Sequence, residues 1–125
     1  MKITHPPISH NDERGSIVDV IGTNASTSVT HITQKANAIR GNHYHLVSIE
    51  HIYVLSGCLI ASALLIDDMD AKVTTAVLYP GDLLCNLPGE AHALEATVDS
   101  CFISITCGPK HQGDTYPLAV SSRRA

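Results

Sequence analysis

The sequence predicts an all-β domain, built as an antiparallel sandwich or barrel. Short runs with alternating apolar residues recur along the 125 residues, separated by Gly, Pro, Asp and Asn. Hydrophobic residues make up 44% of the chain, yet there is no tryptophan and only one phenylalanine, so aliphatic residues must form the core. Such a core favours strands. No window shows a sustained helical apolar period with caps, so little helix is expected.

The elements follow one another in a regular order. Residues 1–15 contain two adjacent prolines and are expected to form an N-terminal arm or edge strand that could lie across a partner subunit. Nine further runs are expected to be extended, because most of them alternate apolar and polar residues and are bounded by Gly, Pro, Asp or Asn; residues 38–45 are expected as a short extended piece. These strands are expected at residues 16–21, 28–33, 38–45, 50–55, 58–66, 72–79, 83–87, 92–98 and 100–106.

The turns between these runs are marked by their composition. Ser56-Gly57 is a two-residue turn signal between two strand-like runs. Residues 67–70 read Asp-Asp-Met-Asp, which lacks the rest of a calcium loop and is interpreted as a hairpin tip. Residues 16–107 are therefore expected to form one barrel, followed by a turn-rich tail at residues 108–125 whose last few residues are mobile.

The charge and the cysteine content of the chain indicate which kind of partner and which compartment to expect. Twelve acidic and eight basic residues give a net charge of −4, with no basic stripe, so a small-molecule substrate is expected rather than nucleic acid. No segment has the length and hydropathy of a signal peptide or a membrane span. The four cysteines form no CxxC pair and are expected to be reduced core residues in a cytoplasmic protein.

The stretch from Gly41 to Gly57 carries the chemistry of the chain. His43 and His45 are two residues apart, so on a strand both side chains point to the same face. Glu50 lies in the same stretch and His92 follows after Gly57, which completes three imidazoles and one carboxylate. This set suits one divalent transition metal ion, namely zinc, iron, manganese or nickel. Without the other two groups, a His-x-His pair is more often satisfied by backbone hydrogen bonds.

These motifs resemble those of the cupins, a family of small β-barrels. The first cupin motif is matched by His43, His45, Glu50 and Gly57. The second is matched by Gly81-Asp82, Pro88-Gly89 and His92, although cupins commonly leave a residue between that Pro and Gly. The resemblance implies a cupin-type double-stranded β-helix, or jelly-roll barrel, and a homodimer.

A narrower similarity links the chain to nucleotide-deoxysugar 3,5-epimerases and to the metal-binding cupin domain of some capsular-polysaccharide sugar enzymes. It is carried by residues 12–16, by the Arg40-Gly41-Asn42-His43-Tyr44-His45 run, and by residues 88–92 and 114–117. In the metal-free epimerases the residue matching His43 is the base, and the one matching Arg40 helps to hold the nucleotide. This chain departs from them at His45. A metal-bound His43 has no free lone pair and cannot be the base.

The resemblance implies an isomerase or epimerase of sugar metabolism that removes a proton next to a carbonyl. Arg40 would bind a phosphate or carboxylate of the substrate. Glu90 and a metal-bound water are the candidates for proton transfer. Tyr53 has the opposite strand parity to Glu50, so it is expected to point away from the metal.

Two other functions remain open from sequence. An iron-dependent dioxygenase would use the two open positions that four ligands leave on a six-coordinate ion. A non-catalytic ligand-binding cupin module is also possible, because no base is identifiable and cupins host many chemistries. His31 and His51 lie in strand-like runs and face either the barrel or the solvent.

Overall fold

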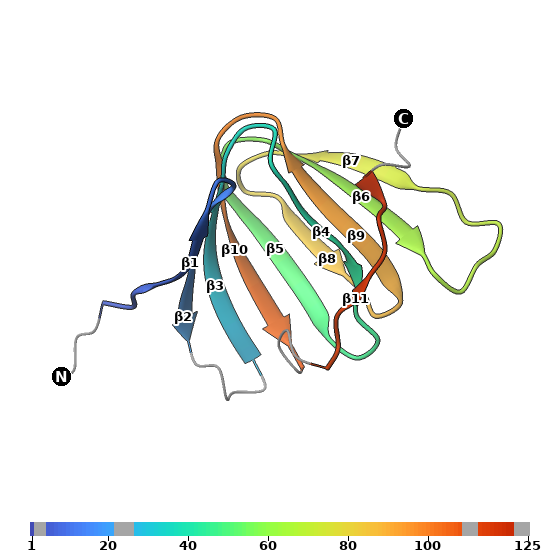
Figure 1. The fold of residues 1–125 in the computed structure, drawn as a ribbon, viewed down its shortest axis with the longest axis horizontal. Helices are drawn as coiled ribbons and strands as arrows, with labels where there is room; N and C mark the ends of the chain where they lie inside the picture. Colours follow the sequence, from blue (N-terminus) through green and yellow to red (C-terminus); the bar gives the residue numbers. More distant parts are fainter. Residues whose placement is uncertain (2–4, 22–26, 109–112, 122–125) are drawn as a thin grey trace.

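The computed structural model of the chain describes residues 1, 5–21, 27–108 and 113–121, and these residues contain strands and no α-helix (Figure 1). The strands are β1 (Ile8–Asp12), β2 (Gly15–Ile21), β3 (Thr27–Gln34), β4 (Ile39–Tyr44), β5 (Ile49–Ser56), β6 (Leu59–Leu65), β7 (Thr74–Leu78), β8 (Leu83–Asn86), β9 (Glu90–Ala96), β10 (Ser100–Cys107) and β11 (Tyr116–Pro117).

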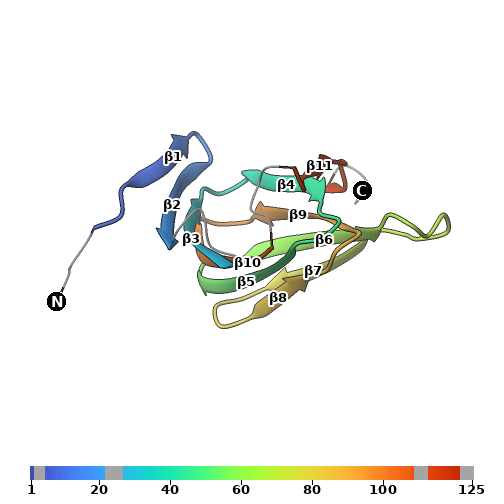
Figure 2. The same cartoon turned by 90° about the horizontal axis from the view of Figure 1, so that it is seen from below.

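The strands form two sheets that lie face to face (Figure 2). The six-stranded sheet has the order β1-β2-β3-β10-β5-β8, and the five-stranded sheet has the order β11-β4-β9-β6-β7. Each strand pair in them is antiparallel. The connections cross repeatedly between the sheets, as in a jelly roll. The predicted all-β, antiparallel jelly-roll architecture is confirmed.

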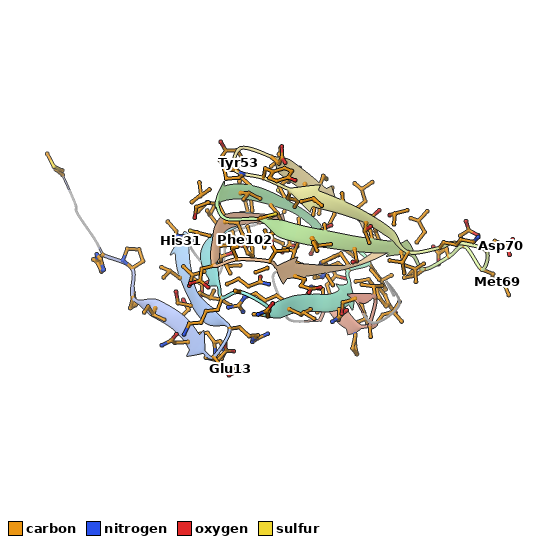
Figure 3. All side chains as sticks on the ribbon, turned by 90° about the horizontal axis from the view of Figure 1, so that it is seen from above. Glu13, His31, Tyr53, Met69, Asp70 and Phe102 are labelled. Carbon is orange, nitrogen blue, oxygen red and sulfur yellow. The ribbon has the colours of Figure 1, made fainter. Side chains whose placement is uncertain are left out.

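The core lies between the two sheets and is aliphatic apart from Phe102. In the six-stranded sheet Phe102 on β10 pairs with Val54 on β5, and both are essentially inaccessible to solvent. In the five-stranded sheet Leu59 on β6 pairs with Ala96 on β9, and both side chains are fully buried. Figure 3 shows Phe102 between the layers. Burial of these facing side chains holds the sheets together.

The predicted strands agree with β2 to β10 to within two residues at each end. The segment expected as an arm or edge strand contains β1, which lies at the edge of its sheet and pairs with β2. The short strand β11, which pairs with β4, lies in the segment that was expected to be a turn-rich tail. Residues 122–125, expected to be mobile, lie outside the described residues.

The expectation that the cysteines are core residues is wrong. Cys85 and Cys107 are exposed, and Cys58 and Cys101 are only half-buried. All four are free thiols. In β10, Cys101 and Cys107 lie on the face that points outward, because the opposite set of residues packs into the sandwich. The inward set of β10 is Ser100, Phe102, Ser104 and Thr106.

The C-terminal segment covers the outer face of the five-stranded sheet. Val120 is fully buried against Ala91 and Ala93 of β9, with Leu118 packed beside them. The side chain of Asn42 on β4 holds this segment, because its Oδ1 accepts hydrogen bonds from the backbone N–H of Val120 at 2.8 Å and from the next residue at 3.0 Å. Within the described part of the chain, no helix is long and apolar enough to cross a membrane.

Candidate metal centre

Three histidines meet where the end of β4 lies beside β9. His43 is in β4 and pairs with His92 in β9, while His45 directly follows the last residue of β4. The ligand nitrogens of the three rings all lie within 4.8 Å of one another, and the ring centroids are separated by 4.8 to 5.3 Å. His43 and His45 thus point to the same side, as their spacing predicts. The three rings could hold a metal ion.

A bulge in β4 gives His43 its direction. The pairing of β4 with β9 shifts register between Gly41 and His43. Gly41 has φ +94° and Asn42 has φ 58°, both in the left-handed region, and a Cβ on Gly41 would lie 2.8 Å from the carbonyl oxygen of His92. Only glycine allows this close approach of β4 to β9. Bulges next to functional sites re-aim side chains in this way.

Backbone carbonyls fix the tautomers of two of the rings. Nδ1 of His45 lies 2.7 Å from the carbonyl oxygen of Asp114, and Nδ1 of His92 lies 3.0 Å from that of Glu90. A carbonyl oxygen only accepts hydrogen bonds, so each Nδ1 must carry the proton. Nε2 of each neutral ring then has a free lone pair. This arrangement is typical of histidines that bind a metal through Nε2.

His92 fits a metal ligand in burial as well as in tautomer. Its side chain is 5% exposed, and its Nε2 has no hydrogen-bond partner among the described residues. Desolvation lowers the pKa of His92, although the Glu50 carboxylate opposes this effect. Burial therefore favours the neutral form, which is the form that binds metals. A buried polar atom without a partner is costly, and a metal ion on Nε2 would satisfy it.

Glu50 lies beside the histidines. Its Oε1 is 3.5 Å from Nε2 of His92, although Glu50 is not within the tight three-histidine group. Asn86 on β8 donates to Oε1 at 3.2 Å, and the hydroxyl of Ser104 on β10 donates to Oε2 at 2.9 Å. These two donors hold the carboxylate on the inner face of β5, directed at the rings. The predicted four-residue set is thus gathered in one place.

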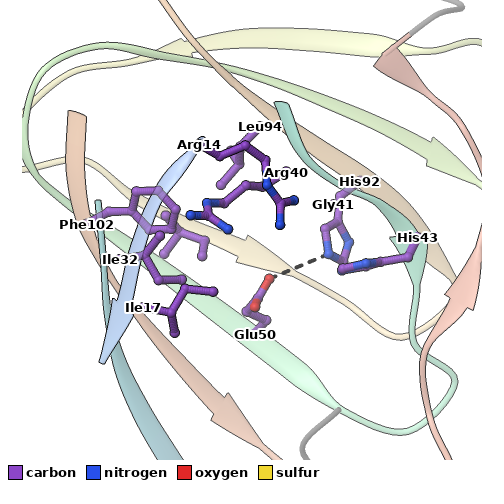
Figure 4. A pocket seen from close by; sticks show the side chains of 11 residues that line it. Arg14, Ile17, Ile32, Arg40, Gly41, His43, Glu50, His92, Leu94 and Phe102 are labelled. Carbon is purple, nitrogen blue, oxygen red and sulfur yellow. Dashed lines mark ion pairs between the residues drawn. The ribbon is translucent and has the colours of Figure 1, made fainter. Parts of the chain in front are cut away.

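A cavity of about 290 Å³ opens in front of this group (Figure 4). Its polar lining includes His43, Glu50 and His92 together with two guanidinium groups, those of Arg14 and Arg40. The rest of the wall is apolar and comes from both sheets. It consists of Ile17, Ile32, Ile52, Leu94 and Phe102, with Gly41 at the bulge.

The two arginines are held differently. Arg14, in the β1–β2 turn, forms an ion pair with Asp12, with Nη2 2.6 Å from Oδ2. This hydrogen-bonded pairing holds the pKa of Asp12 far below its usual range. Arg40 donates to the carbonyl oxygen of Thr33 at 3.2 Å, while its buried Nε has no partner among the described residues. Desolvation, and then the nearby charge of Arg14, lower the pKa of Arg40. An anion between the two guanidinium groups would relieve both effects.

Glu90, the predicted proton carrier, lies outside this cavity. It lines two other cavities, beside β7 and β8, and its carboxylate accepts a hydrogen bond from the backbone N–H of Leu87 at 3.3 Å. Its backbone carbonyl, however, accepts the Nδ1 proton of His92. Tyr53 is 42% exposed and points away from the barrel, as its strand parity predicts (Figure 3).

Asp114 is a residue whose role the sequence did not reveal. It is 3% exposed, and its carboxylate accepts hydrogen bonds from the backbone N–H groups of residues 46, 47 and 48 at 2.8 to 3.2 Å. It thereby fixes the loop that follows His45, while its carbonyl holds the His45 ring. The only signal was its place in the 114–117 segment. Nothing in the sequence marked Asn86 or Ser104 as partners of Glu50, because their contacts depend on strand register.

Solved structures share this fold. The capsular polysaccharide assembling protein CapF from Staphylococcus aureus superimposes with a TM-score of 0.82 at 24% identity, over 94% of this chain and 33% of that chain. A variant of oxalate decarboxylase from Bacillus subtilis gives 0.72 at 19% identity, over 94% and 34%. Oxalate decarboxylase from Lactobacillus farciminis, in a formate complex, gives 0.72 at 20% identity, over 90% and 34%. The chain spans about a third of the length of each.

Sequence comparison points the same way. No curated protein matches the chain significantly. The family model described as the polysaccharide biosynthesis C-terminal domain matches residues 10–79, which is more than half of the chain and includes part of β1 and all of β2 to β7. The structural neighbours share the jelly-roll fold that the resemblance to cupins implies. The chain therefore belongs to the polysaccharide biosynthesis C-terminal domain family.

Proposed function

We propose that this chain is a metal-dependent isomerase or epimerase that acts on a carbonyl-bearing sugar or nucleotide sugar. One observation carries the proposal. A single cavity is lined by two of the clustered histidines, by Glu50 and by two guanidinium groups, with an apolar wall between them. A metal ligand set at one end and paired cations nearby suit a substrate that has both a carbonyl group and a phosphate.

In this proposal His43, His45, Glu50 and His92 hold one divalent ion. Such an ion would act as a Lewis acid on a substrate carbonyl and so acidify the neighbouring C–H bond. Arg40 and Arg14 would bind the phosphate of the substrate and orient the sugar. The apolar wall, including Phe102, would limit the access of water to the reacting carbon. His43 would then be a ligand and not a base.

The identity of the ion is open among zinc, iron, manganese and nickel. Mixed imidazole and carboxylate ligands suit several of these ions. One solved structure of Bacillus subtilis oxalate decarboxylase is described as having Mn(II) centres. Manganese is accordingly included in the metals to be tested.

The proposed partners are the small-molecule substrate and a second copy of the chain. The family to which the chain belongs is described as the polysaccharide biosynthesis C-terminal domain. One structural neighbour is a capsular polysaccharide assembling protein. Both descriptions support a sugar nucleotide as the substrate class.

Solvent exchange tests this function. The metal-loaded protein would be incubated with keto-sugar nucleotides in D2O, without oxygen, and deuterium on the carbon next to the carbonyl would be measured by mass spectrometry. We expect incorporation that depends on the metal. The matched variants are Arg40→Met, which should lose most of the exchange at low substrate concentration, and Lys72→Met, which removes a cation that does not line the cavity and should not.

Two results would contradict the proposal. Oxygen consumption by iron-loaded protein, without deuterium exchange, would indicate a dioxygenase instead. Tight substrate binding, with neither exchange nor oxygen consumption, would indicate a ligand-binding module. The increase in melting temperature with each nucleotide sugar identifies the compounds that bind. Binding can therefore be measured even when neither exchange nor oxygen consumption occurs.

A further inference from the structure

The outer face of the six-stranded sheet is unusually apolar for a surface. On β10 the outward residues include Ile103 and Ile105, whereas the inward ones include Ser104 and Thr106. The more apolar side of this central strand therefore points away from its own core. Cross-strand neighbours extend the pattern, since Ile103 lies between two outward residues on β3 and β5. The row through Ile103 is Val18, His31, Ile103, Tyr53 and Leu83, and the row through Ile105 is Val29, Ile105, His51 and Cys85.

This face carries no formal charge at neutral pH. The rows centred on Cys101, Ile103, Ile105 and Cys107, with their partners on β3, β5 and β8, contain no Asp, Glu, Lys or Arg. Charged residues nevertheless make up 16% of the chain, which has a net charge of −4. Among the described residues, the charged side chains therefore lie outside these rows. Depletion of charge is the compositional mark of an interface core.

The two sheets differ in how their outer faces are covered. The chain covers the outer face of the five-stranded sheet with its own C-terminal segment, which buries Val120 completely. No segment of the described residues covers the rows on the six-stranded sheet in this manner. Tyr53 and Leu83 there are 42% and 61% exposed.

From these observations, and resting on the homodimer included in the proposed function, we infer that the chain dimerises through the outer face of its six-stranded sheet. A twofold axis places the same patch of each subunit against its copy, so a charged patch would repel itself. An uncharged, apolar face avoids this repulsion. Elsewhere the net negative charge opposes association of one copy with another.

The size of the face is of the order that a stable dimer needs. Five strands at a spacing of about 4.8 Å, each contributing about seven residues of about 3.3 Å, span roughly 550 Å² in the plane of the sheet. Side chains that stand up from the sheet make the accessible area larger than this plane. A stable interface buries about 800 Å² on each partner.

Two variants with the same change of charge test the inference. Tyr53→Lys places a cation in the centre of the face, while Val77→Lys places one on β7 of the other sheet, where Val77 is 48% exposed. Sedimentation of the metal-loaded full chain should show a dimer for the parent and for Val77→Lys. Tyr53→Lys should dissociate at least about tenfold more readily, because buried tyrosines are frequent hot spots.

The native thiols provide a second measurement that needs no variant. In the monomer, the thiol of Cys85 is exposed on this face. Cys58 is not on this face, because it lies in the turn between β5 and β6. Iodoacetamide labelling of Cys85 should slow as the protein concentration rises, while labelling of Cys58 should not. A parent that stays monomeric would overturn the dimer, independently of deuterium exchange. A dimer that Tyr53→Lys leaves intact, with constant Cys85 labelling, would overturn the choice of face.

Discussion

At the scale of single residues, Asp114 is not one of the four proposed ligands, but it holds the His45 ring and the loop that follows it. Burial alone would raise the pKa of its carboxyl group, but hydrogen bonds from the backbone N–H groups of Leu46, Ser48 and the residue between them outweigh burial and lower the pKa. The folded protein therefore binds this proton more weakly than the unfolded chain. The stabilisation is present above the unfolded pKa of about 3.9 and is lost as the pH falls through the folded pKa.

Substitution of Asp114 by Asn should lower the free energy of unfolding by about 1 to 3 kcal/mol at pH 7, because charge-assisted hydrogen bonds to three N–H groups become weaker. Urea unfolding at several pH values measures the effect. The difference from the parent should shrink as the pH falls below about 4. The control is Asp70→Asn at the exposed tip of the β6–β7 hairpin, which should change little (Figure 3). A difference for Asp114→Asn that does not vary with pH would be evidence against the account.

The role of Glu90 is also decided at this scale. Its carboxylate is engaged with the N–H of Leu87, outside the cavity, while its backbone carbonyl orients His92. We therefore expect Glu90→Gln to keep metal binding and most of the deuterium exchange, since the carbonyl is unchanged. The kcat for exchange is the measurement, with KM as a check on substrate binding. A loss of kcat of about a hundredfold or more, at unchanged metal content, would instead assign proton transfer to the carboxylate.

At the scale of elements, the bulge in β4 decides whether the histidines meet. A comparison of two glycines separates two costs of adding a side chain. One is the strain of a positive φ, and the other is the clash where β4 lies close to β9. Gly41 and Gly81 have similar φ values of +94° and +92°, but a Cβ would meet the backbone of β9 only at Gly41, while nothing lies within 4 Å of one at Gly81. The two sites thus share the conformational strain and differ in the contact.

Gly81→Ala should cost about 1 to 2 kcal/mol, the strain of an L residue in the left-handed region. Gly41→Ala should cost about 1 to 3 kcal/mol more, because β4 must move away from β9. Only Gly41→Ala should weaken metal binding, since the movement separates His43 from His92. Chemical unfolding and metal titration measure the two effects. Equal stability losses, with equal metal affinity, would show that the close approach of β4 and β9 has no role in the site.

For the whole molecule, sequence periodicity predicted nine strands in an antiparallel sandwich or barrel, because inward and outward positions alternate in antiparallel sheets. The jelly-roll arrangement was implied by the resemblance to cupins. The same periodicity could not tell which face of β10 points inward. Its cysteines and isoleucines have the composition of a core, and they lie outside because the barrel is closed by Phe102 and small polar residues. Which of the two alternating sets of side chains points inward depends on how the strand packs against the other sheet. The local sequence pattern does not carry that information.

The candidate site was predicted to a similar extent. Spacing and the cupin resemblance identified His43, His45, Glu50 and His92, which the fold gathers in one place. The contribution of Arg14 was not predicted, because it depends on how the β1–β2 hairpin folds over the cavity. Asp114 was likewise missed, since its partners are backbone groups nearly seventy residues away along the chain.

The central claim is that these four residues bind one divalent metal ion, and metal content tests it most directly. Protein purified without an affinity tag would be analysed by elemental mass spectrometry, together with His45→Ala and the control His51→Ala, which removes a histidine from the outer face. We expect about one metal ion per chain in the parent and in His51→Ala, and little in His45→Ala, because three ligands hold an ion more weakly than four. Equal metal content in His45→Ala and the parent would contradict the ligand assignment.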